Sequence, residues 1–113
     1  MADHDWVKNF PAEITVCDST GSLCEMNLAS EVMFESDGGI GLLQTNVLDC
    51  HPDPCRGKLE RLMDDQKTNA YLSTKNGKTR FIFQAPWKKD GTYSGYVEIS
   101  FEVPQEIQHF VRG

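Results

Sequence analysis

The C-terminal part of the chain alternates between apolar and polar residues with a period of two. Along its last predicted strand, Val97, Ile99, Phe101 and Val103 alternate with Tyr96, Glu98, Ser100 and Glu102. This period predicts an antiparallel strand with one face on the core and one face in solvent. The preceding segment, residues 79–87, alternates in the same way, with Phe81, Phe83 and Ala85 on one side. We expect the apolar sides of both strands to face the interior.

Short turn signals separate the predicted strands. Asn76-Gly77 follows a strand predicted over residues 69–74, and Asn-Gly between two strands is the strongest short-range signal for a hairpin. Near the N-terminus, residues 13–17 are rich in β-branched side chains and predict a strand. A turn containing Asp, Ser and Gly then leads into a second strand over residues 22–26. The pattern therefore predicts one hairpin at the start of the chain and three strands at its end.

Helix signals fill the middle of the chain. Asn27 is a good N-cap for a short helix over residues 28–34. Asp53 followed by Pro54 predicts the start of a longer helix that runs to about Lys67, with a capping carboxylate and a proline at the first helical position. Its apolar stripe contains Leu59, Leu62 and Met63. The order of elements is that of an α+β protein with an antiparallel sheet and helices on one face.

Both ends of the chain carry short apolar patterns. Residues 5–9 predict a short amphipathic helix that presents Trp6 and Phe10, which are common interface anchors. Residues 105–112 predict a second short helix after the last strand. These terminal segments either pack on their own domain or, in the functional alternative, contact a second copy.

Composition and charge narrow the function. A chain of 113 residues with a formal net charge of −6 predicts one acidic domain. This charge argues against binding nucleic acid or an anionic membrane. With neither a signal peptide nor a membrane span in the pattern, we expect a cytoplasmic protein with reduced cysteines. Four cysteines without a CxxC pair do not support a structural zinc site. No catalytic motif or phosphate loop is present, so we expect a protein that is not an enzyme.

Most of the candidate chemistry lies in residues 46–55, between the predicted short helices and the longer one. This stretch holds two cysteines, Cys50 and Cys55, one histidine, His51, and two carboxylates, Asp49 and Asp53. The helix start accounts for Asp53, whereas residues 46–51 remain as candidates for binding.

An ordered set of motifs resembles the PAS (sensory box) family over about residues 11–106. Asp18, Gly21, Asn27 and Ala29 match a "DxxGxxxxxNxA" opening, residues 42–49 resemble "LIGKNLLD", and later glycine turns match the end of the domain. Cys50-His51-Pro52 is similar to the "HP" that opens the family's long helix, in a CHP variant most similar to PAS domains of uncharacterised bacterial proteins. Gln44 replaces a usual glycine, and residues 101–104 lack the usual "DIT".

This resemblance implies a single PAS-like domain with a five-stranded antiparallel sheet in the order 2-1-5-4-3. It further implies a sensory or regulatory role in signal transduction, through a small ligand in an internal pocket, through dimerisation, or through both. The expected homodimer forms through the N-terminal segment with Trp6 and Phe10 or through the outer sheet face. Two alternatives stay open: an interaction module with a filled core, and a small enzyme that uses His51 and Asp49.

The pocket of such a domain lies between the sheet and its helices. The predicted ligand-binding residues are Asn46, Cys50, His51, Leu59, Met63, Phe81, Phe83 and Ile99. His51 is a candidate ligand of a haem iron; the alternative is a histidine that hydrogen-bonds at the start of the helix. Val47 follows Asn46, so the "NCRFL" motif of flavin photoreceptors is absent. A cinnamate-type chromophore on Cys50 or Cys55 is a further alternative, and the identity of any cofactor stays open.

Overall fold

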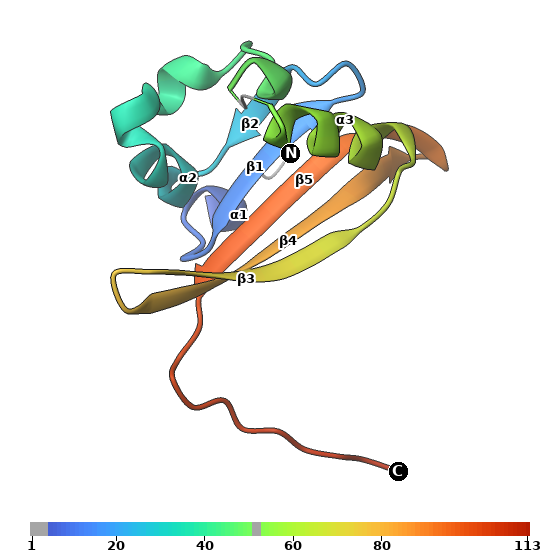
Figure 1. The fold of residues 1–113 in the computed structure, drawn as a ribbon. Coiled ribbons are helices and arrows are strands. Elements are labelled where there is room, and N and C mark those ends of the chain that lie inside the picture. Colours follow the sequence, from blue (N-terminus) through green and yellow to red (C-terminus); the bar gives the residue numbers. More distant parts are fainter. Residues whose placement is uncertain (1–4, 51–52) are drawn as a thin grey trace.

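The computed structural model describes residues 5–50 and 53–113, apart from the Cys50 side chain. Within these ranges one five-stranded sheet has the order β2-β1-β5-β4-β3, and neighbouring strands run antiparallel (Figure 1). The strands are β1 (Glu13–Asp18), β2 (Leu23–Met26), β3 (Asn69–Lys75), β4 (Lys78–Lys89) and β5 (Thr92–Glu102). The α+β class and the strand order expected from the sequence are confirmed.

The helical segments between β2 and β3, which include α2 and α3, lie on one face of this sheet (Figure 1). The α-helices are α1 (Asp5–Lys8), α2 (Leu28–Met33) and α3 (Cys55–Asp64), and three short 3₁₀ helices, η1 (Glu35–Asp37), η2 (Gly39–Leu42) and η3 (Val47–Cys50), connect α2 to α3. Among the described residues, none of these helices is long and apolar enough to span a membrane. The predicted longer helix is present, but Pro54 rather than Asp53 occupies its capping position, without a side-chain hydrogen bond.

The hairpin turn predicted at Asn76-Gly77 is confirmed, and Asp90-Gly91 forms a turn of the same kind directly before β5, which begins at Thr92. Asn76 and Gly77 have φ angles of 54° and 76°, and Asp90 and Gly91 have φ angles of 52° and 80°. Positive φ at both central residues is the requirement of a type I′ turn, whose twist matches that of the flanking strands. These turns place β3, β4 and β5 side by side, with ten paired positions between β4 and β5.

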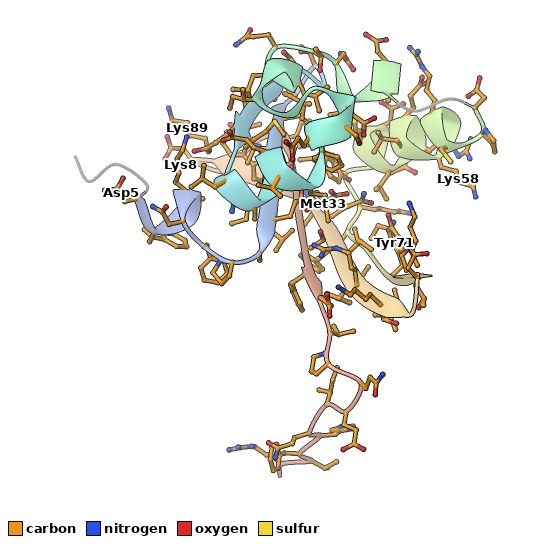
Figure 2. All side chains as sticks on the ribbon, turned by 90° about the vertical axis from the view of Figure 1, so that its left-hand side faces the viewer. Asp5, Lys8, Met33, Lys58, Tyr71 and Lys89 are labelled. Atoms are coloured by element: carbon orange, nitrogen blue, oxygen red, sulfur yellow. The ribbon has the colours of Figure 1, made fainter. Side chains whose placement is uncertain are left out.

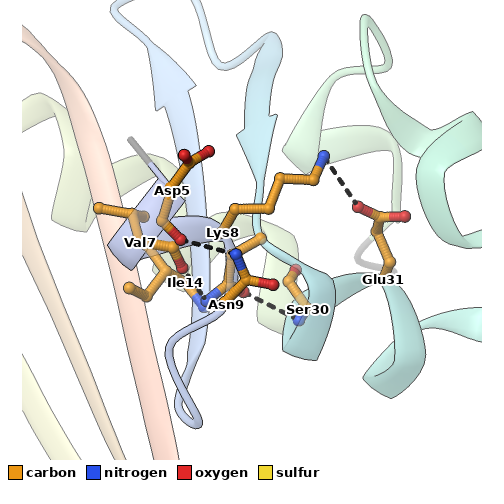
Figure 3. Close-up of polar contacts among 8 residues, drawn as sticks. Asp5, Val7, Lys8, Asn9, Ile14, Ser30 and Glu31 are labelled. Atoms are coloured by element: carbon orange, nitrogen blue, oxygen red, sulfur yellow. Dashed lines mark hydrogen bonds and ion pairs between the residues drawn. The ribbon is translucent and has the colours of Figure 1, made fainter. Parts of the chain in front are cut away.

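Asn27 joins the N-terminal segment to the sheet and to α2. Its buried side chain accepts hydrogen bonds from Ser30 N and Ile14 N, each at 3.0 Å, and donates to the carbonyls of Val7 and Ala12 at 3.0 and 2.8 Å. Figure 3 shows Val7, Ile14 and Ser30 converging from the three segments. The cap predicted for α2 is therefore confirmed, and the same amide also fixes the chain that leads into β1.

The face of the sheet that carries the helices is the opposite of the one predicted. Ile82, Tyr96 and Ser100 are buried beneath the helices, whereas Phe83 and Phe101 are 37% and 40% exposed. Because successive side chains of a strand point to opposite faces, Phe81, Phe83, Ile99 and Phe101 lie on the outer face. The predicted alternation is present, but the expectation that its most apolar side faces the helices is wrong.

The C-terminal segment is not helical. After β5 the chain from residue 103 to residue 113 leaves the domain as an extended tail (Figure 1), with Ile107, Phe110 and Val111 exposed. The helix predicted over residues 105–112 is therefore wrong. A helix of that length is marginal in water unless an apolar face packs against something, and the tail contacts no such surface in this structure.

A candidate ligand-binding cavity

The inner face of the sheet and the helices above it enclose a cavity of about 590 Å³. A volume of this size lies within the range of about 300–1,000 Å³ that is usual for small-molecule sites. Met33 on α2 and Tyr71 on β3, both labelled in Figure 2, are two of the residues that line this space. The cavity therefore extends from the helical layer to the edge strand of the sheet.

Strand register gives the cavity a polar end and an apolar end. Across β1 and β5, Glu13 pairs with Ser100 and Thr15 pairs with Glu98, so four polar side chains stand together on the inner face. One row further along, Cys17 pairs with Tyr96. Around this row lies the hydrophobic cluster of the domain, which includes Cys17, Leu23, Leu42, Val47, Leu59, Met63 and Tyr96.

Glu13 is a buried carboxyl group at the polar end. Only 1% of its surface is exposed, and it accepts hydrogen bonds from Ser100 Oγ at 2.8 Å and from the hydroxyl of Thr15. Thr15 Oγ1 also lies 2.5 Å from Ser30 Oγ, so the network reaches α2. Burial, followed by the negative charge of Glu98, raises the pKa of Glu13 to about 7. The polar end thus holds a carboxyl group that titrates near neutral pH.

Arg80 contributes the positive charge of the cavity lining. Its Nη2 donates to Ser100 Oγ at 2.9 Å, so Ser100 connects the guanidinium to the carboxyl group of Glu13. The Nε of Arg80 is buried and has no hydrogen-bond partner in the part of the chain that the structure describes. This donor is the clearest unmet hydrogen-bonding requirement in the cavity.

Glu98 is held in place from the edge of the sheet. Asn69 Nδ2 donates to Gln84 Oε1 at 3.1 Å, and Gln84 Nε2 donates to Glu98 Oε1 at 2.9 Å. These three residues lie side by side on the inner face of β3, β4 and β5. The chain of hydrogen bonds fixes the Gln84 amide with its N–H toward the carboxylate, which stays an acceptor in the middle of the cavity.

The apolar end is closed by α3. The Tyr96 hydroxyl lies between the carbonyl oxygens of Leu62 and Lys67 and hydrogen-bonds to the end of this helix. Met63 is buried beside it, and burial raises the pKa of the Cys17 thiol, which keeps that thiol protonated and unreactive. This end therefore offers mainly apolar surface.

The predicted site residues are divided among three places. Leu59 and Met63 line the cavity. Phe81, Phe83 and Ile99 lie on the outer face, and none of the three is among the described residues of the lining, so their predicted location was wrong because the faces were assigned in reverse. The outer position follows from the polar side chains of β5, which hydrogen-bond to partners on β1 and β4 instead of facing solvent.

The remaining predicted residues belong to the stretch before α3. Asn46 lies outside the described lining; its Nδ2 donates to Thr20 O and its Oδ1 accepts from Leu48 N, both at 2.9 Å, so it stabilises a turn. His51 and the Cys50 side chain lie outside the described residues, and the haem and chromophore hypotheses on them stay predictions. Asp49, the proposed partner of His51 in an enzyme, is an exposed carboxylate that lies 3.6 Å from Arg56.

The polar lining, namely Thr15, Arg80, Glu98 and Ser100, was not predicted, nor was Glu13, which hydrogen-bonds to Thr15 and Ser100. A signal for it was present, because polar residues alternate with large apolar ones on adjacent central strands of an antiparallel sheet. That pattern indicates either a solvent-exposed face or a polar cavity. Among the described residues, no group of three or more histidine, cysteine, aspartate or glutamate side chains is placed to bind a metal ion.

The strand order and the single helical layer over a cavity are those of the PAS fold. Three solved structures share it. The PAS domain of Bordetella pertussis BvgS has a TM-score of 0.65 and 16% identity over 89% of this chain and 83% of that one. A sensory box sensor histidine kinase from Vibrio cholerae has a TM-score of 0.60 and 14% identity, covering 91% and 90% of the two chains.

The third similar structure is a dimer of Vibrio cholerae VqmA, described among LuxR-type receptors, with a TM-score of 0.66 and 13% identity. It matches 97% of this chain, which spans 56% of the VqmA chain. No protein-family model and no curated protein sequence matches the chain. At these identities the similarity establishes the PAS fold.

Proposed function

We propose that this chain is a sensory PAS domain that acts in signal transduction by binding a small molecule in its internal cavity. The observation that carries the proposal is the cavity of about 590 Å³, with hydrogen-bonding side chains at one end and apolar side chains at the other. In the alternative, an interaction module with a filled core, side chains would occupy this volume. The sensor histidine kinase among the similar structures supports the sensory role. On this proposal the domain acts through binding and not through catalysis.

The proposal is tested by measuring whether a ligand binds in the cavity and whether its binding depends on the lining residues. Native mass spectrometry of freshly purified protein should show an adduct, or a screen of metabolites should raise the melting temperature. Replacing the lining residue Leu59 with tryptophan should obstruct part of the cavity and weaken either signal, with folding checked by circular dichroism. Ile107→Trp, in the exposed tail, is the matched control and should leave ligand binding unchanged.

If no adduct and no stabilising compound is found, or if Leu59→Trp binds as well as the wild type, the proposal fails. An absorption spectrum from the same preparation tests the haem hypothesis, because a bound haem absorbs strongly near the blue end of the visible range. A coloured protein that loses its colour in His51→Ala would identify His51 as the iron ligand.

We further propose that the outer face of the sheet binds a second copy of this chain. Ten apolar residues lie together on this face: Ile14, Val16, Ala70, Leu72, Phe81, Phe83, Ala85, Val97, Ile99 and Phe101. The rings of Phe81 and Phe101 lie 5.7 Å apart and those of Phe81 and Phe83 lie 6.4 Å apart, so the aromatic surface is continuous. The VqmA structure is a dimer, which supports self-association in this fold.

Trp6 and Phe10 form a second exposed apolar contact and are the alternative dimer site. They are 69% and 46% exposed and their rings pack edge to face at 6.3 Å. Lys8 Nζ lies 3.9 Å from Glu31 Oε2, which attaches this segment to α2 (Figure 3).

A further inference from the structure

We infer that the ligand of this cavity is a monocarboxylic acid with an apolar body, and that its carboxylate binds Arg80. The inference rests on the proposed ligand-binding function and specifies the chemistry of the ligand. Three features of the cavity support this inference: Arg80, Glu98 and the apolar end.

One donor of Arg80, its Nε, lacks an acceptor among the described residues. It lies on the inner face of β4, two residues from the buried Ile82, and lines the cavity. Ser100 Oγ accepts from Nη2, whereas the buried Nε has no partner. A buried donor left without an acceptor costs roughly 1–3 kcal/mol, and more when the group is charged. A carboxylate is the acceptor that suits a guanidinium best, because its two oxygens match two N–H groups of the planar fork.

Four carboxyl groups must be considered: Glu13, Glu98, Glu102, which stands opposite Arg80 on β5, and the exposed Asp37 of the cavity lining. Glu13 is hydrogen-bonded to Thr15 and Ser100, and Glu98 accepts from Gln84. Among the described residues, Arg80 forms no ion pair with a carboxylate. Because burial and Glu98 raise the pKa of Glu13 to about 7, the carboxyl group nearest to Ser100 is largely neutral below that pH. The guanidinium charge is left for a ligand.

Glu98 and the apolar end limit the rest of the ligand. Glu98 lies two rows of the sheet from Arg80 and faces the middle of the cavity, where a second ligand carboxylate would be repelled. Beyond it lie Leu23, Leu59 and Met63, which offer only apolar surface. Three methionines, Met26, Met33 and Met63, are among the lining residues, and their flexible side chains adapt to the shape of an apolar body. The favoured ligand therefore carries one carboxylate at one end.

The test compares three probes with the same chain and different head groups: octanoate, 1-octanol and octylamine. Isothermal titration calorimetry or heteronuclear NMR at neutral pH should rank octanoate tightest and octylamine weakest. In Arg80→Met, octanoate should lose about tenfold to a hundredfold in affinity, as expected for a hydrogen bond to a charged group, while 1-octanol should bind as before. Arg80→Lys should restore part of the loss, and Arg112→Met, in the exposed tail, should behave as wild type.

The possible results separate this inference from the proposed function. If octanoate and 1-octanol bind equally in the wild type, or if Arg80→Met binds octanoate unchanged, the carboxylate assignment is overturned and the cavity remains a ligand site. If no probe binds and native mass spectrometry also shows no adduct, both the carboxylate assignment and the proposed ligand-binding function are wrong. Should Arg80→Met not fold, the ranking of the three probes in the wild type decides the outcome by itself.

Discussion

Glu13 is an acidic side chain in a place where ionisation is unfavourable. It is buried between Thr15 and Ser100, and Glu98 is the neighbouring negative charge. Its pKa of about 7 exceeds the ordinary value of 4.5, so between these values the folded protein holds a proton that the unfolded chain has released. Its contribution to stability is therefore complete below pH 4.5 and is lost as the pH rises through about 7.

Replacing Glu13 with glutamine should remove this pH dependence. Glutamine keeps the size and hydrogen-bonding capacity of the protonated acid without the titration. Between about pH 5.5 and 8 the wild type should lose on the order of 2 kcal/mol of unfolding free energy relative to Glu13→Gln. Urea unfolding at several pH values measures this difference, and the range stays above the pI of about 4.9. Parallel pH profiles for the two proteins, with Glu106→Gln in the tail as control, would show that Glu13 does not titrate in this way.

For single residues, the sequence predicts contacts with neighbours in the chain better than contacts between distant segments. The cap on α2 was predictable because Asn27 directly precedes the helix that it caps. Its hydrogen bonds to Val7 and Ala12 depend on how the N-terminal segment folds back, which no local pattern encodes. The same holds for Arg80 and Glu13, which are far apart in the chain and become neighbours only through the β1–β5 and β4–β5 pairings.

At the scale of elements, Gly95 is the position at which β5 most constrains its neighbours. Its φ angle is 145°, and a Cβ added there would lie 1.9 Å from the carbonyl oxygen of Cys17 on β1. The indole of Trp87 crosses the same place, with Nε1 donating to Cys17 O at 3.1 Å. The absence of a side chain is thus required for β1, β4 and β5 to pack at this point.

Gly95→Ala should therefore be strongly destabilising, by more than about 2 kcal/mol, because both backbone strain and a backbone clash must be relieved. Gly91→Ala provides the matched control. It has a φ of 80° with nothing within 4 Å of the added Cβ, so only conformational strain of about 1 kcal/mol opposes it. Chemical denaturation of both variants measures the difference, and equal losses at the two positions would contradict the close-packing explanation.

The elements were predictable where their signals were local. Asn76-Gly77 and Asp90-Gly91 determine two turns of β3, β4 and β5, and the period of two marks the strands. Which face of a strand meets the helices is not a local property. In β5 the polar side chains find partners on β1 and β4, which makes their burial acceptable, and the apolar set is left outside. The tail fails as a helix for a related reason, because its Ile107 and Phe110 have no surface to pack on.

At the scale of the whole molecule, the exposed apolar sheet face predicts self-association. Leu72 is 64% exposed and Phe83 and Phe101 more than a third exposed, on a face without a helical layer. A large exposed apolar surface is typical of an interaction site, and a two-fold interface uses one surface of this kind twice.

Phe83→Glu should weaken the dimer by at least about tenfold in dissociation constant, because the interface would bury an unpaired charge. Ile40→Glu, an exposed apolar residue on the helical side, is the matched control and should leave association unchanged. Sedimentation velocity over a range of concentrations distinguishes the cases. A wild type that remains monomeric throughout would refute the proposal. If Trp6→Glu dissociates the dimer and Phe83→Glu does not, the N-terminal segment is the interface.

The alternation of β5 also has a consequence for how such a domain can diverge in evolution. Glu98 and Ser100 face the cavity, whereas Ile99 and Phe101, which alternate with them along β5, face outward. Substitutions at the first pair alter what the cavity accepts and leave the outer side chains in place, and substitutions at the second pair do the reverse. On the proposals above, ligand specificity and partner specificity thus depend on alternating positions of one strand. Selection can therefore change either one without changing the other.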